Sequence, residues 1–209
     1  MKILIFGASG ATGHELVKRS LEKGYDVTAF VRNPKKLTVA HERLRIVQGD
    51  VKNYASVEAA VGGKDAVLSA LGVSKPLNSD PAVVEGVKNI CAALEKAGPK
   101  RFVYLSFIGV GDSRKSAGFM VKYILPKILK HEIADHELKE ALIRNSRLDW
   151  TIVRPSKLTA GPARGNYRSG EDISTSAFLP TMSRADVAGF MVDQLAEQRY
   201  VRKVVRVLY

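Results

Sequence analysis

The sequence predicts an α/β fold: a doubly wound, mainly parallel sheet with helices on both faces and a small irregular lobe towards the C-terminus. Two observations lead to this prediction. Short apolar segments alternate with longer helical patterns along most of the chain. These segments are almost continuously apolar, as in strands that are buried on both faces. The 209 residues fit one domain, and the hydrophobic fraction of 45% is ample for a core.

The first predicted strand, residues 3–6, runs into a turn with glycines at intervals of three, namely Gly7, Gly10 and Gly13. A helical pattern of apolar residues follows over residues 16–21. Glycines permit a tight turn and let a pyrophosphate approach the backbone, while the N–H groups of the helix start attract its charge. We therefore predict a dinucleotide-binding loop in a Rossmann-like fold. The alternative is a merely structural turn.

The second predicted strand covers residues 25–31, and Arg32 and Lys36 follow it. In dinucleotide-binding folds, the residue about 20 positions beyond the glycine loop lies near the adenosine ribose. An acidic side chain there binds the 2′-hydroxyl, whereas an arginine accommodates a 2′-phosphate. No carboxylate occupies this strand end. The sequence therefore favours NADPH over NADH, with a surface arginine as the alternative.

The remaining elements follow in order along the chain. Strands are predicted over residues 44–48, 65–70, 101–106, 149–154 and 203–208, and helices over residues 54–61, 81–97, 128–144 and 183–197. Because the carboxyl ends of parallel strands meet at one edge of a sheet, the loops after the first five strands should surround one crevice. These loops contain Gly7, Arg32, Asp50, Leu71 and Ser106.

Two segments have a different composition. Residues 108–130 combine glycines and small polar residues with apolar residues and lysines around Pro126. We interpret them as a mobile lid over the crevice, with an ordinary packed helix as the alternative. Residues 156–180 are rich in glycine, serine, proline and threonine, which indicates a small irregular substrate lobe. The whole chain, residues 1–209, is thus predicted to be a single NAD(P)-binding domain.

Charge and composition narrow the function classes. The formal net charge is +12, but the basic residues are spread over several segments, so we expect no nucleic-acid partner. No leader pattern and no apolar run approaching 18 residues is present, so we expect a cytoplasmic protein without membrane association. Cys91 is expected in the core. Four histidines without paired cysteines show no metal-ligand spacing, so no metal is expected.

Several motifs together resemble one family. They include residues 5–13 (Ile-Phe-Gly-Ala-Ser-Gly-Ala-Thr-Gly), 49–51 (Gly-Asp-Val), 148–155 (Leu-Asp-Trp-Thr-Ile-Val-Arg-Pro) and 182–187 (Met-Ser-Arg-Ala-Asp-Val). Over nearly its whole length the chain resembles atypical short-chain dehydrogenase/reductases of the NmrA-like group, and within it the biliverdin-IXβ reductase/flavin reductase type. Related chains include reductases of flavins, tetrapyrroles and quinones, and also cofactor-sensing regulators.

The resemblance implies a site residue by residue. It assigns Gly7, Ser9, Gly10, Ala11, Thr12 and Gly13 to the pyrophosphate, Arg32 and Lys36 to the 2′-phosphate, Asp50 and Val51 to the adenine, Leu71 and Gly72 to the adjoining ribose, and Pro155, Ser156, Lys157 and Leu158 to the nicotinamide side. Ser106 matches a small hydroxyl position that would hydrogen-bond a carbonyl of the cofactor or substrate. Phe107 and Ile108 would contact the acceptor.

The sequence departs from the family at the catalytic pair. Conventional short-chain dehydrogenases use Tyr-x-x-x-Lys on one helix, where the lysine lowers the pKa of the tyrosine. Tyr123 and Lys127 have this spacing, but Pro126 between them is expected to start a helix rather than lie inside one. Counting back from Trp150 puts the expected tyrosine and lysine positions at residues 132 and 136 instead.

Ser106 and His136 are therefore the candidate catalytic residues. Each has a structural alternative, a hydroxyl that satisfies local backbone and a histidine at the cleft edge. A missing tyrosine does not exclude hydride transfer, because a flavin-like ring accepts hydride readily and stabilises the resulting anion itself.

The sequence thus predicts an NADPH-dependent reductase that transfers hydride to a small planar conjugated acceptor, such as a flavin, tetrapyrrole or quinone. A redox-sensing or regulatory protein that binds NADP(H) without turnover is the alternative. A sugar-nucleotide epimerase or dehydratase is less favoured, because such enzymes need the proton-moving tyrosine and a larger substrate lobe. We expect a monomer or small homo-oligomer.

Overall fold

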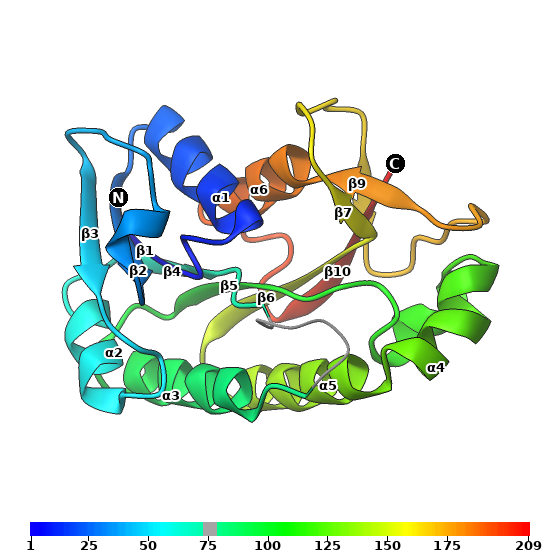
Figure 1. Ribbon diagram of the computed structural model, residues 1–209, viewed down its shortest axis with the longest axis horizontal. Helices are drawn as coiled ribbons and strands as arrows, with labels where there is room; N and C mark the ends of the chain where they lie inside the picture. The colour runs from blue at the N-terminus through cyan, green and yellow to red at the C-terminus, as the bar shows by residue number, and fades with distance from the viewer. Residues whose placement is uncertain (73–78) are drawn as a thin grey trace.

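The computed structural model describes residues 1–72 and 79–209. A central sheet has the strand order β3-β2-β1-β4-β5-β6-β10-β8 (Figure 1). Its strands are β1 (Lys2–Phe6), β2 (Asp26–Val31), β3 (Leu44–Gln48), β4 (Ala66–Ser69), β5 (Arg101–Leu105), β6 (Asp149–Pro155), β8 (Arg168–Gly170) and β10 (Lys203–Leu208). All neighbouring strands are parallel except β10 and β8. The predicted doubly wound, mainly parallel sheet is confirmed.

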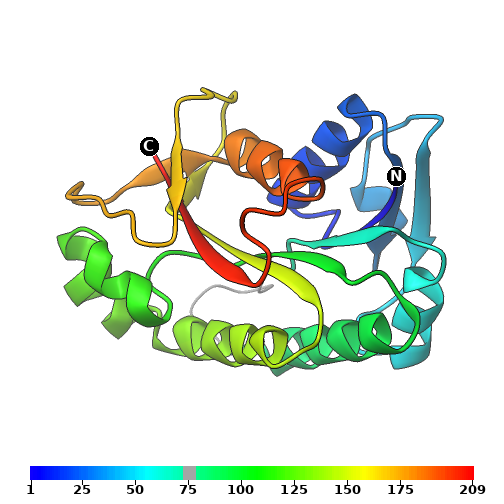
Figure 2. The same ribbon diagram turned by 180° about the vertical axis from the view of Figure 1, so that it is seen from behind.

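Helices cover both faces of this sheet. Helices α1 (Ala11–Glu22) and α6 (Arg184–Asp193) lie on one face, and α2 (Tyr54–Val61), α3 (Pro81–Ala97) and α5 (Lys130–Arg144) lie on the other (Figures 1 and 2). Side chains of β1 alternate between the two layers: Ile3 and Ile5 join the core under α1 and α6, whereas Leu4 and Phe6 join the core over α2 and α3. Because both faces of the strands are buried, their sequences are almost continuously apolar.

The last helix begins with a side-chain cap, and the predicted core position of Cys91 is confirmed. Ser183 is the N-cap of α6, and its hydroxyl accepts a hydrogen bond from the N–H of Asp186 at 3.1 Å. Cys91 is buried in the core between the sheet and α3. Burial raises the pKa of its thiol to about 12, so the thiol stays protonated and acts as a small apolar side chain.

The segment over residues 108–130 is built from short helical pieces. It contains the 3₁₀ turn η2 (Gly111–Ser116), the π-helix η3 (Met120–Ile124) and the short helix α4 (Leu125–Ile128). Pro126 lies in the first turn of α4, but α4 follows η3 without a break in helical backbone, so Pro126 does not begin a separate helix as predicted. The beginning of the segment is anchored, because the N–H of Ile108 donates to the Pro155 carbonyl at 2.8 Å.

The segment over residues 156–180 has more regular structure than its composition predicts. β7 (Lys157–Thr159) pairs with β9 (Thr181–Ser183) in a small second sheet. β8 joins the central sheet as its last strand. Strands of three residues are too short to show a periodic pattern, which is why no pattern in the sequence indicated them. No helix within residues 1–72 and 79–209 has the length and apolar character needed to cross a membrane.

Candidate functional site

A cavity of approximately 560 Å³ lies where the parallel strands end. The loops after the first five strands all line it, through Gly7, Arg32, Asp50, Leu71 and Ser106. The predicted single crevice is thereby confirmed. Its volume is within the range of about 300 to 1,000 Å³ that is usual for small-molecule sites.

The glycine loop forms one wall of this cavity. Gly7 has a φ of +76°, and a β-carbon there would lie 2.5 Å from the carbonyl oxygen of Ala70. A β-carbon on Gly13 would overlap the carbonyl oxygen of Gly7. Gly10 is the N-cap of α1 and makes no side-chain capping bond, and the first turn has no acidic residue. The N–H groups of this helix start are therefore available to an anionic group that approaches the backbone closely.

Arg32 and Lys36 add positive charge to the cavity wall. Arg32 precedes the 3₁₀ turn η1 (Pro34–Lys36), and Lys36 is its last residue. Asn33 caps the turn, because its side chain accepts a hydrogen bond from the N–H of Lys35 at 3.0 Å. Both cationic side chains are exposed, and within the described ranges neither has a carboxylate partner. Two free cations of this kind suit a phosphate group.

The rest of the cavity wall is largely apolar. Leu105 and Phe107, at the end of β5, line it together with Leu158 from β7. Two residues one turn apart on α5, Glu132 and His136, supply polar groups. In the sequence analysis, counting back from Trp150 placed the family's catalytic tyrosine and lysine at these two positions. The cavity therefore joins a basic, backbone-lined part to an apolar part with a carboxyl and an imidazole.

Burial shifts the pKa values of both α5 groups. It raises the pKa of the Glu132 carboxyl, and the nearby Asp135 adds to the rise while Lys139 opposes it. Burial also lowers the pKa of His136 well below 6.5, and Lys139 adds to that effect. His136 is therefore neutral at physiological pH and does not act there as a cationic proton donor.

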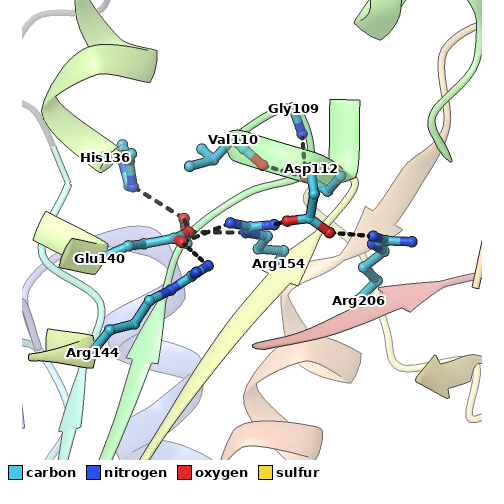
Figure 3. A network of polar contacts seen from close by, with 10 residues as sticks. Gly109, Val110, Asp112, His136, Glu140, Arg144, Arg154 and Arg206 are labelled. Carbon is cyan, nitrogen blue, oxygen red and sulfur yellow. Dashed lines mark hydrogen bonds and ion pairs between the residues drawn. The ribbon is translucent and has the colours of Figure 1, made fainter. Parts of the chain in front are cut away.

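Ser106 leads from the cavity into a network of ion pairs that is buried at Arg154 and Glu140 and extends to the exposed Asp112 (Figure 3). At its centre Arg154 of β6, which is 1% exposed, donates from Nε and Nη2 to the two oxygens of Glu140 at 2.9 and 2.7 Å. Its Nη1 donates to Asp112 at 2.7 Å, and Arg206 of β10 donates to the other oxygen of Asp112 at 2.6 Å. The network ties η2, α5, β6 and β10 together.

Ser106 and His136, the two candidate catalytic residues, are brought together by this network. The Ser106 hydroxyl donates to Oε1 of Glu140 at 2.7 Å, and its oxygen lies 3.3 Å from Nδ1 of His136. Because the single hydroxyl proton is engaged by Glu140, donation from Ser106 to a substrate carbonyl would require that bond to break. Phe107 holds the imidazole by an edge-on ring contact with centroids 4.9 Å apart.

Two further polar groups are buried beside the network without hydrogen-bond partners among the described residues. They are Nζ of Lys139 and the hydroxyl of Tyr104. Burial lowers the pKa of Lys139 to about 8, although neighbouring carboxylates, Asp135 first, act in the opposite direction. Burial also raises the pKa of Tyr104 well above its ordinary value, and the charge of Glu140 adds to the rise.

The apparent catalytic pair lies elsewhere. Tyr123 is 52% exposed on η3, with its ring centroid 5.0 Å from that of Phe119. Lys127 is exposed on α4. Neither residue lines the cavity.

Five of the predicted site residues are also absent from the cavity wall: Gly13, Ile108, Pro155, Ser156 and Lys157. Gly13 packs against the glycine loop, as described above. Ile108 is 3% exposed and belongs to a small core cluster with Val121 and Leu208. Lys157 is exposed and pairs through its N–H with the carbonyl of Pro180. All the other predicted residues line the cavity.

The model of a family described as NAD(P)H-binding matches residues 7–198. The chain belongs to this NAD(P)H-binding family. The match covers the glycine loop, the cavity wall and α6, and it confirms the resemblance to atypical short-chain dehydrogenase/reductases. A nicotinamide cofactor fits the glycine loop, where Gly7 and Gly13 have no room for a β-carbon.

The share of each relative that matches this NAD(P)H-binding chain differs widely. A chloroplastic protein of Arabidopsis thaliana is 29% identical over 99% of this chain and 76% of its own length. By contrast, the chain spans only 31% of a 3-beta-hydroxysteroid dehydrogenase of Mycolicibacterium neoaurum and 35% of cinnamoyl-CoA reductase 1 of Petunia hybrida.

Solved structures share the fold over the full chain. A proposed epimerase of Bacteroides thetaiotaomicron is 26% identical with a TM-score of 0.84, covering 100% of this chain and 96% of its own. ChuY of Escherichia coli O157:H7, an anaerobillin reductase, is 23% identical with a TM-score of 0.78, covering 100% of this chain and 97% of its own. At 23% identity the second likeness concerns the fold.

Sequence reasoning missed part of the site of this NAD(P)H-binding protein. Arg184, in the first turn of α6, lines the cavity, and its only signal was its place within the motif over residues 182–187. Glu140 was missed altogether. A charged residue inside an apolar strand, as Arg154 is, signals that a buried partner is needed, but not which carboxylate provides it.

Proposed function

We propose that this protein is an NADPH-dependent reductase that transfers hydride to a small planar conjugated acceptor of the flavin, tetrapyrrole or quinone class. One observation supports this proposal above others. A single cavity joins the glycine loop and the cations Arg32 and Lys36 to an apolar wall formed by Leu105, Phe107 and Leu158. Such a cavity has a part for an anionic dinucleotide and a part for a flat apolar ring.

Each part of the chain has a role in this proposal. The backbone of residues 7–13 binds the pyrophosphate, and Arg32 and Lys36 bind the 2′-phosphate. Bound NADPH supplies the hydride. Phe107 and Leu158 orient the acceptor ring and exclude water from the reacting face. Holding the two reactants in this orientation is the main catalytic contribution that we assign to the protein.

The acceptor class follows from the groups that the cavity wall offers. Among the described wall residues there is no tyrosine and no lysine other than Lys36 and Lys52, His136 is neutral, and Glu132 is a wall carboxyl whose pKa is raised by burial. A simple ketone would need a positioned proton donor at the oxygen. A conjugated ring spreads the negative charge that hydride transfer creates, so solvent protons suffice.

Rapid-mixing kinetics test the proposal. Wild-type protein with bound NADPH is mixed with FMN, biliverdin or a quinone, and nicotinamide oxidation is followed in a single turnover. We expect oxidation well above the protein-free rate with at least one acceptor. Tyr123→Phe should remain within about tenfold of wild type, because Tyr123 is exposed and outside the cavity. Oxidation at the protein-free rate with every acceptor would refute the reductase assignment.

The same experiment separates a second candidate function. The lack of a tyrosine and lysine pair on the described cavity wall also fits a protein that binds NADP(H) as a signal without turnover. Tight NADPH binding in calorimetry together with no oxidation by any acceptor would favour that function. Loss of a thousandfold in Tyr123→Phe would instead restore a conventional short-chain dehydrogenase mechanism.

A further inference from the structure

The hydrogen bonds around Glu140 have a fixed direction. Its carboxylate is paired with two guanidinium groups, Arg154 at 2.7 Å and Arg144 at 3.1 Å, and a paired carboxylate only accepts hydrogen bonds. The contact of 2.7 Å between Glu140 and Ser106 must therefore use the Ser106 proton. The Ser106 oxygen is left with lone pairs alone.

This direction determines the tautomer of His136. Nδ1 of His136 lies 3.3 Å from the Ser106 oxygen, which has no second proton to give, so Nδ1 must carry the proton of this contact. A neutral imidazole has only one N–H, so Nε2 is unprotonated. Nε2 has no hydrogen-bond partner among the described residues, and His136 lines the cavity.

Two aromatic rings and deep burial hold the imidazole of His136 in place. Phe107 packs edge-on against it with ring centroids 4.9 Å apart, the Tyr104 ring lies at 6.3 Å, and only 6% of the residue is exposed. The charged groups around it belong to α5 and the network: Glu132, Asp135, Lys139 and Glu140. The cavity thus contains a rigid, neutral acceptor of hydrogen bonds beside an apolar wall.

We infer that His136 binds an amide-type N–H group of the ligand through Nε2, and that Ser106 and Glu140 are positioning residues that set its tautomer. Two ligands could carry that group: the carboxamide of the nicotinamide, or the imide or lactam N–H of a flavin or tetrapyrrole. Quinones have no such group. The inference rests on the proposed function, and where the acceptor rather than the nicotinamide supplies the N–H, it narrows the acceptor class to rings that carry this group.

The tautomer can be measured directly by ¹⁵N NMR of histidine-labelled protein at neutral pH. We expect His136 to carry its proton on Nδ1, and Ser106→Ala to shift the ring towards the Nε2–H form that predominates in free histidine. His131→Phe, which changes an exposed residue of the same helix, assists assignment and should leave the His136 signals unchanged. An Nε2–H tautomer in the wild-type protein would overturn the inference.

Two ligand pairs identify the group that His136 binds. FMN is compared with its N3-methyl derivative, and NADP⁺ with its 3-acetylpyridine analogue, which lacks the carboxamide N–H. Binding is measured by calorimetry on wild type, His136→Phe and the control His131→Phe. We expect one pair to differ by about tenfold in wild type and control, and by less than about twofold in His136→Phe.

The outcomes separate this inference from the proposed function. A difference in the flavin pair assigns the contact to the acceptor, and a difference in the cofactor pair assigns it to the nicotinamide. Equal ratios in wild type and His136→Phe for both pairs would overturn the inference even if NADPH binding and flavin reduction were intact. Failure of wild type to bind NADP⁺ would instead count against the proposed function, and the NMR result would still decide the tautomer.

Discussion

The two walls of the cavity are built in opposite ways. The glycine loop is one contiguous stretch, residues 7–13, that offers backbone N–H groups and has no capping side chain. The wall around Ser106 and His136 is made of side chains from β5 and α5, and Arg154 of β6 and Asp112 of η2 hold it from behind. The first wall leaves polar groups free for a ligand, whereas most charges in the second are already paired within the protein.

This difference teaches where binding and stability reside. Free N–H groups and exposed cations gain their partners only when an anion binds, so changes there should alter affinity more than stability. Buried, paired charges are stable only while every partner is present, so changes there should alter stability first. Three substitutions, from the largest expected effect to the smallest, sharpen this comparison.

Arg154→Met should have the largest effect. It leaves the nearly fully buried carboxylate of Glu140 without its main partner, which we expect to lower the free energy of unfolding by about 3 to 5 kcal/mol. Urea denaturation measures this loss. Arg144→Met, which removes the partly exposed partner of the same carboxylate, should lower it by less than about 1 kcal/mol. Equal losses for the two variants would show that burial of the pair is energetically unimportant.

The double variant Arg154→Met/Glu140→Met tests the cause of that loss. Replacing both members with apolar side chains removes the uncompensated charge, so it should recover part of the stability of Arg154→Met. A double variant that is less stable than the single one by a full further 3 kcal/mol or so would mean that packing, not charge, accounts for the effect.

Lys139→Met should raise the stability. Burial lowers the pKa of Lys139 in the folded state to about 8 from an ordinary value of 10.5, so the folded protein holds an unfavourable charge at pH 7. This difference corresponds to about 3 kcal/mol at most, and we expect a gain of about 1 to 3 kcal/mol at pH 7. Between pH 8 and 10.5 the unfolded chain binds more protons than the folded one, so wild-type stability should rise through this window.

Urea denaturation at pH 7, 8, 9 and 10 checks both parts. For Lys139→Met, the free energy of unfolding should lack the rise with pH that Lys139 causes in wild type. Lys130→Met, which changes an exposed lysine of the same helix, should show the same pH dependence as wild type. A variant that is less stable than wild type at pH 7 would indicate that the Lys139 ammonium has a stabilising partner.

Arg32→Ala should have the smallest effect on stability and a selective effect on affinity. The side chain is exposed on the cavity wall, so the free energy of unfolding should change by less than about 0.5 kcal/mol. Loss of charge-assisted bonds to a 2′-phosphate should weaken NADPH binding about ten- to a hundredfold and leave NADH binding little changed. Calorimetry with both cofactors measures this, and equal losses would show that Arg32 does not bind the phosphate.

The two walls also differ in how far the sequence predicts them. The glycine loop and the loops that hold Arg32, Asp50 and Leu71 follow from local patterns and from the rule for parallel sheets, because each lies directly after a strand. The network could not be predicted in the same way. Glu140 and Arg154 come from different elements, and no local pattern specifies which buried charges meet. The burial of Ile108 likewise depends on its packing with Leu208 at the far end of the chain.

One consequence concerns solubility. β8, a strand of three residues, pairs antiparallel with Arg206, Val207 and Leu208 and so covers the backbone edge of the C-terminal half of β10, whose sequence is Lys-Val-Val-Arg-Val-Leu. An uncovered edge of that composition is a template for pairing with other chains and for aggregation. Any shortening of the segment over residues 156–180, for example to enlarge the mouth of the cavity for a bulkier acceptor, should therefore retain residues 168–170. A shortened variant without these residues should aggregate before its reductase activity could be measured.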